Sequence, residues 1–215
     1  MIKRTSREHV LKILEKNHKS WQILDIGCNR DAVQYAQTAA DIQDLTSFYK
    51  DKKFVLIEGK DLPFEDNEFD FVFASHVIEH VEDVSYFIKE LQRISKKGYI
   101  ELPSMLEDNI VLSENNSKDH KWFFQFDDVN NILLAEPKKQ LIEPFITFGV
   151  LFGSLRKNFR SSLVLELYWE NEINYKFSEF TTLVNKPYFI TIVKKYLSYR
   201  IRNNKIKLLL AMFFL

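Results

Sequence analysis

The residues best suited to ligand chemistry stand at the end of the first short apolar run of the chain. Residues 22–26 include Asp25 and stop abruptly at Gly27, and a polar loop follows. A short run with β-branched residues and an abrupt turn signal is typical of a buried parallel strand. Ligands of open α/β sheets bind outside the carboxyl ends of the strands, so residues 27–31 form the first candidate binding loop.

The elements that position this loop are further apolar runs of strand length. Acidic residues end two of them, at Asp41 and Glu58. The runs lie at residues 39–42, 53–57, 69–74 and 99–102.

A helix is predicted on either side of the first run. Thr5 and Glu8 have capping-box spacing and begin an amphipathic helix that continues to about Asn17. Residues 32–37 predict only a brief helix.

A longer helix at residues 84–94 leads into the last run. Asp83 is its expected N-cap, and Gly98 is expected to end it after two lysines. The alternation of strands and helices predicts an α/β fold, a doubly wound and mainly parallel sheet with helices on both faces.

Beyond Pro103 the pattern changes and predicts antiparallel β-hairpins in addition to a helix at residues 141–155. The paired strands are expected at residues 122–126 with 132–135, and at residues 163–169 with 173–177.

Composition and charge favour one globular domain without a nucleic-acid partner. The chain has 215 residues, is 46% hydrophobic and carries 30 basic and 30 acidic residues. We expect residues 1–104 to form the ligand-binding core and residues 105–215 to complete the sheet. The single cysteine excludes an internal disulfide, and no signal peptide or membrane span is expected, so a cytoplasmic protein is predicted.

Five fragments of the chain, in one order, resemble the class I S-adenosylmethionine-dependent methyltransferases, in particular a type 11-like subgroup with a shortened first helix. The resemblance covers about Trp21 to Ser104, and the order and spacing of the fragments make chance agreement improbable. It implies a Rossmann-like fold and S-adenosyl-L-methionine as the cofactor, and we expect no metal ion. The fragments are residues 24–28, Asp41, residues 61–70, residues 75–80 and residues 93–99.

The resemblance implies cofactor contacts at the first two strand ends. Gly27 would let the backbone approach, and the loop with Cys28 and Asn29 would offer free N–H groups to the carboxylate of the cofactor. Asp25 would meet the ammonium group through water, and Asp41 would accept from both ribose hydroxyls. The alternative for both acids is a structural role as a loop or helix cap.

The end of the third strand matches the position of the adenine ring. Glu58 would accept from the adenine amino group, while the backbones of Gly59 and Lys60 would face the ring edge. Asp61 is the competing carboxylate.

Two histidines are candidate catalytic residues. His76 follows the fourth strand at a position that faces cofactor and acceptor, and His120 lies in a segment that also resembles the subgroup. Either is a candidate general base, which only a hydroxyl or protonated-amine acceptor would need. The alternatives are a structural hydrogen bond for His76, and a hairpin that merely covers a sheet edge for His120. A further histidine, His80, is expected only to orient the loop before Asp83.

The first loop departs from the family because Asn29 and Asp31 replace further glycines. Asparagine tolerates left-handed backbone, whereas Asp31 would repel a carboxylate unless it turns to the ammonium group or Arg30 screens it. A loop with one glycine also disfavours a dinucleotide enzyme.

Three functions stay open. The first is a methyltransferase acting on a small-molecule, glycan or lipid-precursor acceptor. The second is a non-catalytic binding protein of the same fold that has lost turnover. The third is a structural partner of a surface-polymer biosynthetic enzyme. The basic tail from Lys194 to Leu215 predicts either peripheral membrane contact or a last helix packed on the core.

Overall fold

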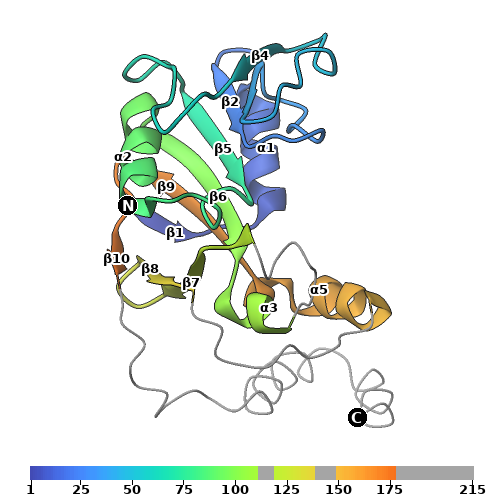
Figure 1. Ribbon diagram of the computed structural model, residues 1–215, viewed down its shortest axis with the longest axis vertical. Helices are drawn as coiled ribbons and strands as arrows, with labels where there is room; N and C mark the ends of the chain where they lie inside the picture. The colour runs from blue at the N-terminus through green and yellow to red at the C-terminus, as the bar shows by residue number, and fades with distance from the viewer. Residues whose placement is uncertain (111–118, 139–148, 178–215) are drawn as a thin grey trace. The chain divides into compact units, whose positions relative to one another are not determined.

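A computed structural model describes residues 1–110, 119–138 and 149–177 (Figure 1). These residues belong to one compact unit, Met1–Ser178, and Glu179–Leu215 form a second unit. The basic tail, the first half of the helix expected at residues 141–155 and the rest of the second unit lie outside the described residues. None of the described helices is both long enough and apolar enough to cross a membrane.

The main sheet has seven strands in the order β1-β9-β6-β5-β2-β3-β4. Strands β2 to β6 are parallel, and β9 is antiparallel to β6 and to β1. The predicted doubly wound, mainly parallel sheet is therefore confirmed. Its strands are β1 Ile2–Arg4, β2 Ile23–Ile26, β3 Thr38–Asp41, β4 Lys53–Leu56, β5 Phe71–Ser75, β6 Lys97–Pro103 and β9 Val164–Glu170.

The strand order places a topological switch point between β2 and β5. The chain proceeds outward from β2 to β3 and β4, and then returns to add β5 on the other side of β2. Crevices at such points are the usual ligand sites of open parallel sheets. The loops that follow Ile26 and Ser75 border this crevice.

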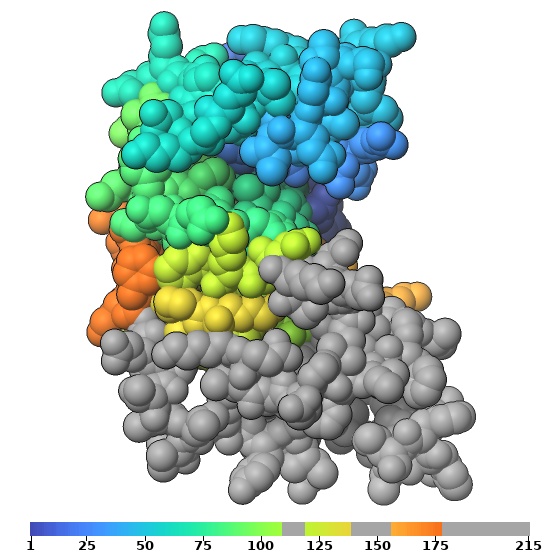
Figure 2. All heavy atoms as spheres, viewed as in Figure 1, coloured from blue at the N-terminus to red at the C-terminus, as the bar shows by residue number. Residues whose placement is uncertain are grey.

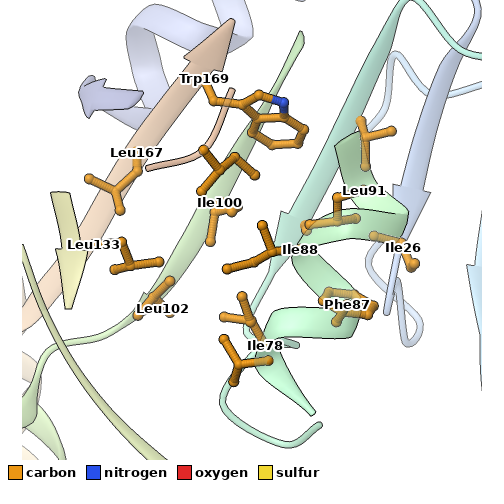
Figure 3. Packing of buried hydrophobic residues seen from close by; sticks show 14 of the residues in the cluster. Ile26, Ile78, Phe87, Ile88, Leu91, Ile100, Leu102, Leu133, Leu167 and Trp169 are labelled. Atoms are coloured by element: carbon orange, nitrogen blue, oxygen red, sulfur yellow. The ribbon is translucent and has the colours of Figure 1, made fainter. Parts of the chain in front are cut away.

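Helices α1 (Arg7–Asn17) and α2 (Val84–Ile94) cover opposite faces of the sheet. Alternating strand residues face each helix, as the period of two requires: Ile23 and Phe71 join the cluster of α1, whereas Leu24 joins that of α2. Figure 3 shows Ile88 and Leu91 of α2 directed at this second face. The two clusters therefore cover both faces of the sheet behind its loops.

Three local predictions about helices are wrong. Ser6, not Thr5, caps α1, and its side chain accepts from the backbone N–H of His9. Residues 32–37 contain a turn at residues 34–35 and no helix. Gly98 does not end α2, because Ser95 is the C-cap and Gly98 lies inside β6 opposite Trp169. A Cβ at Gly98 would collide with the Trp169 indole, so this glycine makes room for a buried aromatic ring.

The first of the two predicted hairpins is confirmed and the second is wrong. β7 (Trp122–Asp127) and β8 (Ile132–Pro137) form an antiparallel pair. β9 instead enters the main sheet, and β10 (Tyr175–Phe177) pairs in parallel with β8 in a separate three-stranded sheet. The turn after β9 therefore connects two sheets. The remaining helices are α3 (Met105–Ile110) and α5 (Gly149–Leu163), and α5 includes the second half of the helix expected at residues 141–155.

Candidate functional site

The loops after β2 and β5 meet at Gly27. This residue has φ +67°, and its amide donates to the Ala40 carbonyl at 2.8 Å. A Cβ at Gly27 would collide with the side chain of Val77, in the loop after β5. Glycine is therefore required twice, by the left-handed backbone and by the neighbouring loop.

Asp41, at the carboxyl end of β3, holds this first loop in place. Its side chain accepts from the Asn29 amide at 2.7 Å and from the Gln43 amide at 3.0 Å, and Asp41 is only 8% exposed. Asn29 has φ +43°, which confirms that asparagine takes the left-handed turn where the family has a further glycine.

The expected array of free backbone N–H groups is not present in this loop. Most of its amides already donate within the protein, to backbone carbonyls or to the side chains of Asp25, Asp41 and Tyr49. An anion at this loop therefore needs a donor from elsewhere. The engaged amides are those of Gly27, Cys28, Asn29, Asp31, Ala32 and Val33.

Tyr49 braces the same loop, a role that the sequence did not indicate. Its hydroxyl donates to the Asn29 carbonyl at 2.7 Å and accepts from the Ala32 amide at 3.0 Å. The neighbouring thiol of Cys28 is buried, and burial raises its pKa to about 12. Cys28 is thus a neutral packing residue and not a thiolate.

Asp25 is buried at 3% exposure and accepts from the Val33 amide at 2.6 Å. Burial raises its pKa to about 7, although the hydrogen bond from Val33 opposes the shift. The carboxyl group therefore fixes the end of the first loop. A water-mediated contact with a cofactor stays a prediction.

Asp25 gives a testable dependence of stability on pH. The folded chain binds the Asp25 proton more tightly than the unfolded chain, so this stabilisation is complete below pH about 4 and is lost as pH rises through about 7. Replacing Asp25→Asn should remove a slope of up to about 1.4 kcal/mol per pH unit from the free energy of unfolding. Urea unfolding of both proteins between pH about 4 and 8 measures the difference, and parallel curves would contradict the assignment.

The loop after β4 carries the residues expected at an adenine ring. Asp61 accepts from the Tyr86 hydroxyl of α2 at 2.5 Å, and the Lys60 ammonium lies 5.0 Å from the centre of that ring. Glu58 is exposed, and Gly59 has φ +91°. Of the two carboxylates that compete for the adenine amino group, Asp61 is thus already engaged by Tyr86, whereas Glu58 is exposed.

An exposed apolar side chain, which the sequence analysis did not single out, lies next to Asp41. Ile42 is 76% exposed, directly after the end of β3. The register pairs Asp41 with Leu56 of β4, so this apolar surface borders the loop with Glu58. An exposed isoleucine beside a polar strand end offers an apolar surface against which an aromatic ligand ring can pack.

His76 lies between two buried carboxylates at the end of β5. Its Nδ1 is 3.1 Å from Glu79 Oε1, and its Nε2 is 3.5 Å from Glu101 Oε1. Burial alone would lower the pKa of His76, but the hydrogen bonds and charges of Glu101 and Glu79 raise it to about 9. The Arg156 guanidinium also lies 3.0 Å from Nε2, a hydrogen bond that only neutral histidine could accept. We assign the imidazolium, because two carboxylates outweigh one cation.

The charge cluster around Glu101 is the largest feature that the sequence analysis missed. Glu101 lies on β6 with its side chain 3% exposed, and it pairs with Arg7 of α1 and Arg160 of α5. Arg7 is 32% exposed and also approaches the Ser75 hydroxyl at 3.4 Å. No local pattern joins these residues, because three distant segments supply them.

His120 lies beside the same loop after β5. It is 8% exposed, its Nδ1 is 2.6 Å from Asp108 Oδ1, and its ring contacts that of His80. The Lys121 amide donates to the Glu79 carbonyl at 2.8 Å. The structure therefore gathers His76 and His120 around Glu79. Asp25, Gly27 and Asp41 gather at the first loop, and Glu58 to Asp61 at the loop after β4.

Comparison with known proteins finds a family match for part of the described unit. Residues 7–100 match the model of a methyltransferase domain. The matched range overlaps the stretch from Trp21 to Ser104, so the resemblance inferred from the sequence is confirmed there.

Individual relatives match shorter stretches. Ajmaline N-methyltransferase of Rauvolfia serpentina is 34% identical over 77 residues, which are 36% of this chain and 25% of that protein. Chloroplastic tocopherol O-methyltransferase of Arabidopsis thaliana is 36% identical over 73 residues, 34% of this chain and 21% of that protein. A crystallised S-adenosylmethionine-dependent methyltransferase of Mesorhizobium loti is 14% identical with a TM-score of 0.40, and covers 46% of this chain and 55% of its own. The chain thus spans a quarter or less of these two curated relatives.

Proposed function

We propose, with the methyltransferase domain of residues 7–100 as the premise, that this chain binds S-adenosyl-L-methionine and transfers its methyl group to a small-molecule acceptor. The observation that carries the proposal is the rim beside the switch point, where Asp41 holds the Gly27 loop against the end of β3. This rim is where a doubly wound sheet binds a nucleoside.

The ribose and adenine have partners along this rim. Each carboxylate oxygen of Asp41 accepts one backbone N–H and keeps a further lone pair for a ribose hydroxyl. The exposed side chain of Ile42 would lie against the adenine ring. Glu58 would accept from the adenine amino group, because Asp61 already accepts from Tyr86.

The carboxylate of the cofactor needs a cation, because the loop amides are engaged within the protein. We assign Arg7 to this role. Its side chain is 32% exposed, and its guanidinium lies beside Ser75 at the end of β5 and beside Glu101 of β6. Guanidinium groups bind carboxylates in a two-pronged geometry and stay charged at every physiological pH.

The chain contributes mainly by positioning, because the cofactor supplies an already activated methyl group when it is bound. A histidine with a pKa of about 9 carries its proton at neutral pH. His76 therefore donates hydrogen bonds and contributes positive charge at that pH, and its role as a general base stays a prediction.

The small-molecule acceptor is supported by the names of the two plant relatives, whose stated acceptors are ajmaline and tocopherol. A glycan or a lipid precursor stays a further candidate acceptor. A cytoplasmic location, with membrane contact through the tail, also stays a prediction.

Titration calorimetry with S-adenosylhomocysteine tests the cofactor site through Asp41. Asp41→Asn should weaken binding by about 1–3 kcal/mol, since a ribose hydroxyl loses its charged partner. An analogue without the two ribose hydroxyls should bind the parent protein and the variant equally.

Asp44→Asn is the matched control, because Asp44 is an exposed carboxylate three residues away that accepts from the Thr46 amide. Equal weakening for both ligands would show that Asp41 acts only through the loop. Transfer of labelled methyl groups to candidate acceptors then distinguishes a catalytic methyltransferase from a non-catalytic binding protein of the same fold. Cofactor binding with no transfer to any of them would favour the non-catalytic protein.

A further inference from the structure

Two histidines and a buried glutamate converge between the loop after β5 and the segment before β7. The candidate ligand atoms of Glu79, His80 and His120 all lie within 4.8 Å of one another. The two imidazole rings meet edge to face, with centroids 4.7 Å apart. Figure 2 shows the green segment near residue 80 in contact with the yellow-green segment near residue 120.

Each histidine is oriented through its Nδ1 atom. His120 Nδ1 lies 2.6 Å from Asp108 Oδ1, and His80 Nδ1 lies 3.2 Å from the Asp119 carbonyl oxygen. A hydrogen bond from Nδ1–H fixes the tautomer and leaves the Nε2 lone pair free. Histidines that bind metal ions show this arrangement, with a carboxylate or a carbonyl as the outer partner.

Glu79 supplies the third ligand atom. The side chain is 0% exposed, and its Oε1 pairs with His76. Its Oε2 has no hydrogen-bond partner among the residues that the structure describes. A buried carboxylate oxygen without a partner is costly, so the position favours a cation.

We propose that Glu79, His80 and His120 bind a divalent transition-metal ion of the Zn²⁺ type. Two imidazole nitrogens and one carboxylate oxygen are a common ligand set for such ions, and three protein ligands leave a position open. Ligands at about 2.0–2.2 Å from the ion require the three atoms to draw closer. The exposed side chain of His80 can make this adjustment, while the Lys121 amide holds Glu79 in place.

This site departs from the sequence expectation of no metal ion, and its three ligands are not among the residues assigned to the cofactor. In the sequence, Glu79 and His80 belong to the fragment at residues 75–80. Their partner His120 stands 40 positions further along the chain, so only the folded structure joins the three.

Direct titration of the full-length chain, untagged and freed of metal with a chelator, tests the proposal. Zn²⁺ should bind with one-to-one stoichiometry by calorimetry, and Co²⁺ should give the visible absorption of a site with nitrogen ligands. His80→Ala should reduce affinity by more than about 100-fold, and Asp108→Asn by about 10–100-fold through the orientation of His120.

His9→Ala, which removes an exposed histidine of α1, is the matched control and should bind as the parent does. Circular dichroism checks that each variant is folded. Glu79→Gln retains the volume of the buried side chain and should also lose the metal. The proposal is overturned if the parent protein binds neither ion, or if His80→Ala and Glu79→Gln bind as tightly as His9→Ala.

Discussion

Gly27→Ala is expected to abolish measurable binding of S-adenosylhomocysteine and to destabilise the fold by about 2–6 kcal/mol. The alanine backbone must adopt φ +67°, and its Cβ would collide with the side chain of Val77. Strained left-handed backbone and steric overlap each cost about 1–3 kcal/mol. The loop can escape both only by leaving the position that Asp41 and Ala40 hold. Calorimetry and urea unfolding measure the two losses.

A double variant separates the two causes. In Gly27→Ala with Val77→Ala, the collision is removed while the backbone strain stays. We expect this protein to regain part of the lost stability relative to the sum of the two single changes. Val77→Ala alone is the control for the lost valine. Strict additivity would show that the two loops do not press on each other at Gly27.

Glu101→Gln is expected to lower the free energy of unfolding by about 1–3 kcal/mol, because it removes the buried charge that partners Arg7, Arg160 and His76, whose own side chains are about a third exposed. Glu101 accepts from the Tyr99 hydroxyl at 2.8 Å, and it pairs with Arg160 at 2.9 Å and Arg7 at 3.3 Å. Burial opposes its ionisation, yet the pKa of Glu101 lies well below the ordinary value because His76, Arg7, Tyr99 and Arg160 stabilise the charge.

The pH dependence of the same variant follows from the sign of that shift. A lowered pKa contributes stability above the ordinary pKa of a glutamate, about 4.3, and this stability is lost on acidification. The parent protein should therefore lose more stability than Glu101→Gln between pH about 5 and 3. Glu170→Gln is the control, since its partner Lys97 at 3.2 Å lies at the surface and the pair contributes about 0–1 kcal/mol. A loss at Glu101 no larger than this control would contradict the assignment.

The parallel sheet was predictable because the local sequence of each strand carries the pattern of a buried strand. The run that holds Ile23 and Leu24 is apolar on both faces, as a strand covered by helices requires. Asp83 caps α2 as its residue type suggests. The left-handed turn at Asn29 was predictable for the same reason, since asparagine tolerates that conformation.

Features that depend on distant partners were not predictable. Gly98 looks like a helix end in sequence, and only the opposite Trp169 explains why it must be small. The sequence also carried no sign that the loop amides are engaged, because Asp41 and Tyr49, which accept from them, lie further along the chain. Roles of Asp25, Asp41, Glu58, His76 and His120 toward a bound cofactor stay predictions.

The position of β9 has a consequence for how the chain is made. β9 separates β1 from β6, so Ile2–Arg4 have no neighbour in the sheet until residues up to Glu170 have been synthesised. Until then the β6 edge stands open, and open edges recruit strands from other molecules. A nascent chain stalled before Val164 would expose this edge.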